Sequence, residues 1–150
     1  MIGWLLDTHV VAALASPSGA PSVRAWAGGQ DEERLFLSVL SLAEIGKGIE
    51  QLAPDEPSRS RYAGALAAIE ARFAGRIISV SDAVVRRWGA ISGRVRRETG
   101  HPPPVVDTLL ASSAIEHDLY LVTRNIKGVR LSGCAVFNPW TDDVSAFPLR

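Results

Sequence analysis

The chain has 150 residues, of which 47% are hydrophobic and 21% are charged, as in a single globular domain with its own core. Lysine plus arginine and aspartate plus glutamate number 16 each, which argues against a protein that binds nucleic acid mainly through bulk positive charge. Cys134 is the single cysteine, so an internal disulfide and a CxxC-type zinc site are excluded. No apolar run approaches the roughly 18 residues that span a bilayer. We expect one domain over 1–150 in the cytoplasm, without a signal peptide and not bound to a membrane.

Apolar runs and helical periodicities alternate along the chain. In chain order they predict a strand over 2–6, a helix over 8–15, a loop over 16–19, a strand over 35–38, and helices over 39–52 and 58–73. They then predict a strand over 76–80, helices over 81–98 and 106–117, and strands over 119–122 and 134–137. Pro57 suits the first turn of the 58–73 helix, and the residues after about 141 are expected to form a flexible tail. Strands joined by helical crossovers indicate an α/β fold with a mostly parallel central sheet of four to five strands, covered by helices.

Three acidic residues and one asparagine lie at equivalent ends of the predicted βα units. Asp7 directly follows the first strand, Glu44 lies in the helix after the second, and Asp107 opens the helix that leads into the fourth. Asn125 lies just past the end of that fourth strand. Because the carboxyl ends of parallel strands share one edge of the sheet, we expect these side chains to converge there. Gathered carboxylates repel one another, and a hard divalent cation such as Mg²⁺ or Mn²⁺ relieves the repulsion and can activate water against a phosphodiester.

Each of these residues also has a purely structural interpretation. Asp7 suits the N-cap of the first helix. Ser41 and Glu44 match the S-x-x-E capping box, which would turn the Glu44 carboxylate back onto the backbone. Asp107 is favourable in a first helical turn, and Asn125 is a common turn residue. The coincidence of all four at equivalent positions favours a functional site.

Four segments resemble the PIN domains of VapC/FitB-type toxins. They are Ile2–Thr8, Leu37–Ile49, Pro104–Ala114, and Leu121–Asn125 followed by Asn138-Pro139-Trp140. Their order and spacing span nearly the whole chain, and the second and fourth are the most specific. The resemblance implies a PIN-like α/β/α sandwich.

The resemblance also implies the function of an Mg²⁺-dependent endoribonuclease, the toxin of a VapBC-type toxin–antitoxin module, with Mn²⁺ as a substitute metal. Asp7, Glu44 and Asp107 would be the metal-binding acids, with Asn125 at the fourth catalytic position. The implied partners are RNA, a second copy in a homodimer, and a VapB-like antitoxin whose tail occupies the active groove. Such assemblies are heterotetramers or larger, and they bind promoter DNA only through the antitoxin.

Two departures from the family pattern leave open whether one metal ion or two bind. The fourth acidic position is filled by Asn125, which carries no charge, and an Asp-Phe pair common three residues further on is replaced by Gly128-Val129. Arg124 lies beside the expected site, and we expect it to contact an RNA phosphate. The arginines of the 81–98 helix are expected to lie mainly on a solvated face.

Two other functions remain as alternatives. A receiver-like phospho-acceptor module also gathers acids at strand ends, but it requires adjacent acids after the first strand and a lysine after the last. Here Asp7 is followed by Thr8, and the last strand ends in Asn138-Pro139. A PIN fold kept only for binding a partner, without nuclease activity, is the other alternative, and Asn125 and Gly128 are its support.

Overall fold

A five-stranded sheet forms the centre of the computed structural model, which describes residues 1–150. Its strands are β1 (Gly3–Leu6), β2 (Leu35–Ser38), β3 (Ile77–Ile78), β4 (Leu119–Val122) and β5 (Val136–Phe137). Their spatial order is β3-β2-β1-β4-β5, and every neighbouring pair is parallel. The predicted α/β class with four to five strands is confirmed, and the sheet is parallel throughout.

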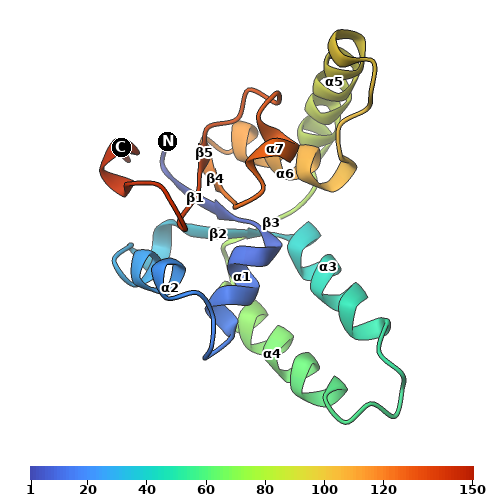
Figure 1. Cartoon of the computed structure of the whole chain (residues 1–150), viewed down its shortest axis with the longest axis vertical. Helices are drawn as coiled ribbons and strands as arrows, with labels where there is room; N and C mark the ends of the chain where they lie inside the picture. Colours follow the sequence, from blue (N-terminus) through green and yellow to red (C-terminus); the bar gives the residue numbers. More distant parts are fainter.

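Helices cover both faces of the sheet (Figure 1). They are α1 (Thr8–Ala15), α2 (Pro21–Gly28), α3 (Val39–Glu50), α4 (Arg59–Arg72), α5 (Asp82–Thr99), α6 (Val105–Glu116) and α7 (Ile126–Val129). In Figure 1, α1 to α4 lie on one side of the sheet and α5 to α7 on the other, while α3 and α4 run side by side away from it. None of the helices is both long enough and apolar enough to cross a membrane.

Successive side chains of the strands enter two different hydrophobic clusters. Trp4 and Leu6 of β1 pack under α1 and α2, whereas Leu5 between them packs on the opposite face with residues of α6. This alternation follows from the two-residue period of a strand. Because both faces are buried, the strands read in the sequence as continuous apolar runs.

Two helices were not predicted from the sequence. Helix α2 has Pro21 in its first turn, a position that suits proline because its fixed φ is already helical. Helix α7 is a single short turn after β4. The expectation for Pro57 was wrong, because α4 begins at Arg59 with Ser58 as its N-cap, so that Pro57 precedes the helix.

The residues after about 141, expected as a flexible tail, pack against the sheet instead. The ring of Phe147 lies 5.4 Å from that of Tyr120 and 4.9 Å from that of Phe137, measured between centroids. The Tyr120 hydroxyl donates to the carbonyl of Pro148 at 3.0 Å, and the backbone N–H of Arg150 donates to Met1 at 3.0 Å. The segment thus covers the edge of an aromatic cluster, and these contacts are ones that a flexible tail would lack.

Candidate active site

Asp7 is buried at the carboxyl end of β1, with 7% of its surface exposed. Its Oδ1 accepts a hydrogen bond from the backbone N–H of Val10 at 2.9 Å, and its Oδ2 accepts one from the hydroxyl of Thr123. Burial raises the pKa of Asp7, although both hydrogen bonds act to lower it. The hydrogen bond from Val10 confirms the interpretation of Asp7 as the N-cap of α1. The cap uses one carboxylate oxygen, and the other faces β4.

Glu44 reaches from α3 toward α1, where its Oε1 accepts a hydrogen bond from the hydroxyl of Thr8 at 2.5 Å. Helix α3 begins at Val39, and its N-cap is Ser38, whose side chain accepts from the backbone N–H of Leu40 at 3.1 Å. Ser41 lies inside the helix, and its buried hydroxyl has no hydrogen-bond partner. The capping-box interpretation is wrong. The Glu44 carboxylate is not folded back on the backbone.

Asp107 lies in the first turn of α6, half-buried, with its Oδ2 facing α7. The side-chain amide of Asn125 donates to that oxygen at 3.0 Å. A Cβ atom at Gly128 would lie 2.6 Å from the same oxygen and 2.9 Å from the Asn125 nitrogen. The two departures from the family pattern are thus linked in space, because the glycine leaves the room that the Asp107–Asn125 pair occupies.

The charges of Asp7 and Glu44 act on Asp107. Burial contributes most to the raised pKa of Asp107, and the negative charges of Asp7 and Glu44 raise it further. The exposed side chain of His9 opposes this effect and lowers the pKa of both Asp7 and Asp107. Segments separated by up to 100 residues therefore place acidic groups within electrostatic reach of each other at one edge of the sheet.

The donor set is suited to a hard divalent cation, because it consists of carboxylate oxygens. The side chains do not surround one point: no three His, Cys, Asp or Glu side chains are grouped closely enough to hold a metal ion. Each carboxylate is instead held by a hydroxyl or amide donor from a neighbouring segment. A cation at this edge would replace these donors and relieve the repulsion on Asp107.

Two threonines at this edge were not singled out by sequence reasoning. Thr8 donates to Glu44, and the buried Thr123 donates to Asp7 and accepts from the backbone N–H of Asn125 at 3.0 Å. Only their positions in the sequence could have indicated them, because Thr123 directly follows β4 and Thr8 directly follows Asp7 at the end of β1. Nothing in the local pattern names their partners.

Arg124 lies at the same end of β4. Its guanidinium stands over the ring of Trp140, 4.7 Å from the centroid, and it is exposed with no ion-pair partner. An arginine held over an aromatic face in this way keeps its hydrogen-bond donors free for an anion. Its place agrees with the expected position beside the acids, and its contact with RNA remains a prediction.

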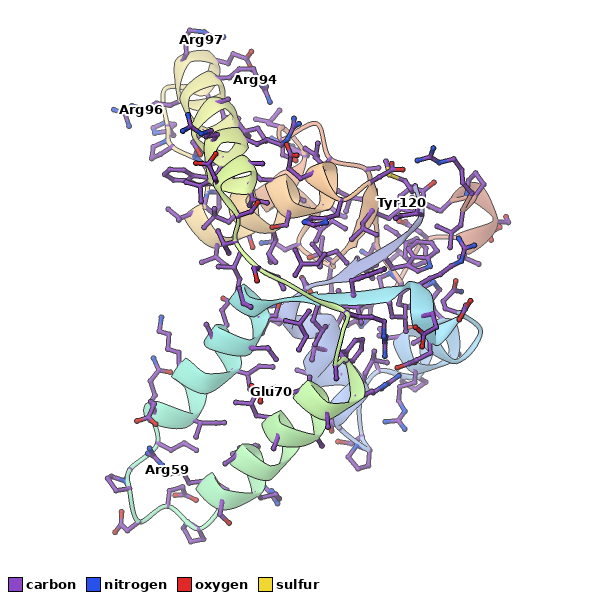
Figure 2. The ribbon with its side chains drawn as sticks, turned by 180° about the vertical axis from the view of Figure 1, so that it is seen from behind. Arg59, Glu70, Arg94, Arg96, Arg97 and Tyr120 are labelled. Carbon is purple, nitrogen blue, oxygen red and sulfur yellow. The ribbon has the colours of Figure 1, made fainter.

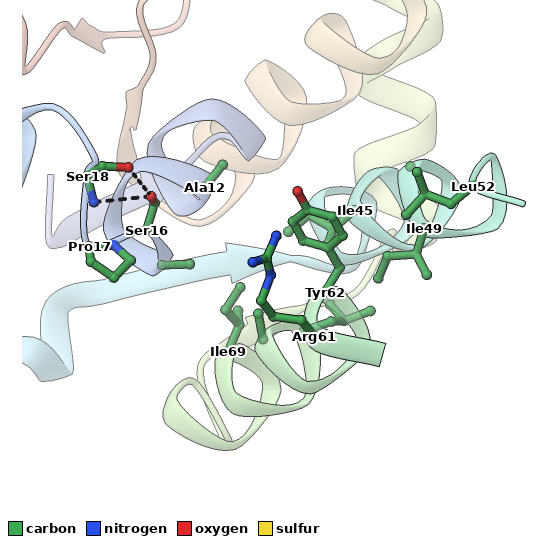
Figure 3. A pocket seen from close by; sticks show the side chains of 14 residues that line it. Ala12, Ser16, Pro17, Ser18, Ile45, Ile49, Leu52, Arg61, Tyr62 and Ile69 are labelled. Atoms are coloured by element: carbon green, nitrogen blue, oxygen red, sulfur yellow. Dashed lines mark hydrogen bonds between the residues drawn. The ribbon is translucent and has the colours of Figure 1, made fainter. Parts of the chain in front are cut away.

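An apolar pocket of about 760 Å³ lies between α1, α3 and α4 (Figure 3). Ile45, Ile49 and Ile69 form much of its wall, and Arg61 and Tyr62 of α4 lie over it. Its residues come from α3 and α4, from the end of α1, and from the loop over 16–18 that follows α1. No carboxylate lines the pocket, so its apolar surface differs chemically from the acidic edge of the sheet.

Residues 4–131 match the family model for the PIN domain. The chain belongs to the PIN-domain family. This confirms the predicted resemblance and the α/β fold that it implied, and it excludes the receiver-like alternative. The matched region includes Asp7, Glu44, Asp107 and Asn125.

Two relatives match this PIN domain over most of their length. Toxin FitB of Neisseria gonorrhoeae is 28% identical over 138 residues, which are 92% of this chain and 99% of that protein. VapC ribonuclease Y4jK of Sinorhizobium fredii is 25% identical over 137 residues, 91% of this chain and 96% of that protein.

Two solved structures share the fold closely. FitAB bound to the IR36 DNA fragment has a TM-score of 0.82 at 26% identity, over 93% of this chain and 97% of the compared chain. FitAcB from Neisseria gonorrhoeae has a TM-score of 0.81 at 28% identity, over 91% of this chain and 98% of the compared chain. The PIN domain is therefore similar along nearly its whole length to proteins named as toxins and ribonucleases.

Proposed function

We propose that this PIN domain is a divalent-metal-dependent endoribonuclease and the toxin of a VapBC-type toxin–antitoxin module. The observation that carries the proposal is that Asp7, Glu44 and Asp107 come from three segments to one edge of the parallel sheet, and none of them is ion-paired with a cationic side chain. The negative charges of Asp7 and Glu44 also contribute to the raised pKa of Asp107. Ligands commonly bind at the carboxyl ends of parallel strands, and acidic groups gathered there without a cationic partner favour a functional site. The names of full-length relatives support the same function.

In this proposal Asp7, Glu44 and Asp107 hold Mg²⁺, or Mn²⁺ in its place. A metal bound there would lower the pKa of a water ligand and neutralise charge on the phosphodiester under attack. Asn125 orients the Asp107 carboxylate through the amide hydrogen bond that it already donates. Arg124, fixed over Trp140, contacts an RNA phosphate beside the scissile bond.

A cleavage assay on single-stranded RNA tests the proposal. We expect cleavage with Mg²⁺ or Mn²⁺, none in EDTA, and a loss of at least about 100-fold in kcat/KM for Asp7→Asn and for Asp107→Asn. Asp82→Asn is the matched control, because Asp82 is an exposed acid that is paired with Arg86 and lies outside the site. Cleavage that persists in EDTA, or in either variant, would refute the assignment and favour a PIN fold that only binds a partner.

We further propose that the chain forms a homodimer in the cytoplasm and binds a VapB-like antitoxin, in a heterotetramer or larger assembly that reaches promoter DNA only through the antitoxin. Solved relatives are toxin–antitoxin complexes, one of them bound to DNA. The apolar pocket between α1, α3 and α4 suits the apolar side chains of such a partner. Leu66→Arg in this pocket should abolish co-purification with the antitoxin, whereas the exposed neighbour Ala67→Arg should not; equal binding by both would contradict the pocket's role.

A further inference from the structure

A second pocket, of about 340 Å³, lies between α5, the loop that precedes α6, and α7. These helices cover the face of the sheet opposite to α1, α3 and α4 (Figure 1). Its wall combines polar and apolar groups that include His101, Pro103, Thr108, Lys127, Arg130 and Leu131. Neither the expected metal ligands nor Arg124 line it.

The pocket adjoins the acidic edge directly. Gly128 lines the pocket, and a Cβ atom on it would lie 2.6 Å from Oδ2 of Asp107. Thr108, which also lines the pocket, is the next residue after Asp107 in the chain. A backbone without a side chain is therefore all that separates the pocket from one carboxylate and its Asn125 partner at this point.

The charge of the pocket is opposite to that of the acidic edge. Its wall contains Lys127 and Arg130 and no aspartate or glutamate, and neither cation forms an ion pair. In the sequence, no acidic residue occurs between Asp118 and Asp142. In a chain whose net charge is zero, this segment is a local excess of positive charge, and it favours an anionic ligand.

The walls of the pocket are fixed by hydrogen bonds. Arg94 of α5 donates to the carbonyl of Leu131 at 2.7 Å and thereby ties α5 to the segment after α7. The hydroxyl of Thr108 donates to Pro104 at 2.6 Å, and that of Ser132 donates to Val129 at 2.5 Å. The shape is therefore formed before a ligand arrives, as in most small-ligand sites. Pro103 and Leu131 add apolar surface that suits a base or a ribose.

We propose that this pocket, defined by Lys127, Arg130 and Leu131, binds the nucleotide next to the scissile phosphodiester of a single-stranded RNA. Lys127 and Arg130 contact its phosphate, and the proline and leucine side chains contact its base or sugar. The volume of about 340 Å³ is large enough for one nucleotide and far too small for a double helix to enter the pocket. The inference rests on the proposed ribonuclease function, because the scissile phosphate is placed at the carboxylates on the other side of Gly128.

Binding measured without metal separates this proposal from the cleavage activity. The probe is a fluorescein-labelled single-stranded RNA of about a dozen nucleotides, titrated in EDTA at several salt concentrations. The double variant Lys127→Gln/Arg130→Gln should raise Kd about ten-fold and reduce the slope of log K against log salt by about 0.7, since both cations contact one phosphate and each phosphate neutralised in a single strand contributes about 0.7.

The matched control is Arg96→Gln/Arg97→Gln. These two arginines lie in the last turn of α5 (Figure 2), between the pocket-lining residues Val95 and Thr99, but they do not line the pocket themselves and form no ion pair. Their substitution removes the same two positive charges as the pocket variant. Kd and the salt slope should stay at the wild-type values. An equal loss in the control would show that general surface charge binds the RNA, and no loss in the pocket variant would overturn the proposal.

A second pair of variants tests the pocket without a change of charge. Leu131 and Val85 have similar exposed fractions, 42% and 44%, and only Leu131 lines the pocket. Leu131→Trp should raise Kd at an unchanged salt slope, and Val85→Trp should leave it unchanged. If Leu131→Trp weakens binding of an acidic antitoxin peptide and leaves RNA binding intact, the site belongs to the antitoxin and the proposal fails. If the wild type binds RNA as expected but never cleaves it with Mg²⁺, the proposed function fails, and the pocket stands as an RNA-binding site with no scissile bond beside it.

Discussion

Glu44→Gln is the substitution that best separates catalysis from stability in this chain. Glutamine keeps the oxygen that accepts from Thr8 and removes the charge that a divalent cation requires. Because Glu44 is exposed and does not cap α3, the free energy of unfolding should change by no more than about 0.5 kcal/mol. For a domain of this size, Tm should therefore shift by at most about 2 °C.

The expected loss of activity is much larger than this change in stability. Removal of one of three metal-binding carboxylates should lower kcat/KM at least about 100-fold, which corresponds to about 2.7 kcal/mol of transition-state stabilisation. The assay combines RNA cleavage at saturating Mg²⁺ with thermal unfolding in EDTA. A large loss of kcat/KM together with a small change in Tm identifies a functional carboxylate, whereas neither measurement does so alone.

Ser38→Ala provides the opposite case. Ser38 caps α3 in extended conformation, with φ −99° and ψ 148°, and its side chain is fully buried. Loss of this cap should cost about 1–2 kcal/mol and lower Tm by about 2–8 °C, with cleavage retained below the transition. If Glu44→Gln unfolds as readily as Ser38→Ala and keeps its cleavage activity, Glu44 has a capping role and the reasoning is refuted.

Three further perturbations have defined outcomes. Gly128→Ala should lower kcat about ten-fold or more with Tm within about 2 °C, because its Cβ displaces the end of the Asp107 side chain; normal cleavage would contradict this. Phe147→Ala should reduce the free energy of unfolding, measured in urea, by about 2–3 kcal/mol, since it removes two aromatic contacts. An unchanged free energy of unfolding would show that the residues after about 141 form a flexible tail. Burial raises the pKa of the Cys134 thiol to about 12, so iodoacetamide at pH 8 should label it slowly in the native protein and rapidly in urea, whereas equal rates would contradict its burial.

Much of the fold could be predicted from the sequence because strands and helices leave local patterns. The runs at 35–38 and 119–122 match β2 and β4 in both bounds, and the helix at 8–15 matches α1. A strand that is buried on both faces forms a nearly continuous apolar run in the sequence, and polar residues at or just after its last position mark where it ends. The acids at these ends identified the edge at which the candidate site lies.

Capping was decided by tertiary structure. Ser38 and Ser41 are both acceptable N-caps by residue type, and Ser41 even has the glutamate that a capping box requires. The pairing of Leu37 and Ser38 with Ile77 and Ile78 in β3 holds Ser38 in extended backbone, so the helix can begin only after it. This pairing joins residues 40 positions apart, and no local pattern records it.

The sequence by itself determined which residue types stand at the ends of the strands, and hence the α/β class, the PIN resemblance and the candidate acids. Only the tertiary structure decided what those acids contact: Thr123 at Asp7, Thr8 at Glu44 and Asn125 at Asp107. Only the tertiary structure, too, set the basic pocket against the acidic edge at Gly128. The physical reason is that periodicity and capping act over a few residues of chain, whereas hydrogen-bond partners and electrostatic repulsion depend on distances in space.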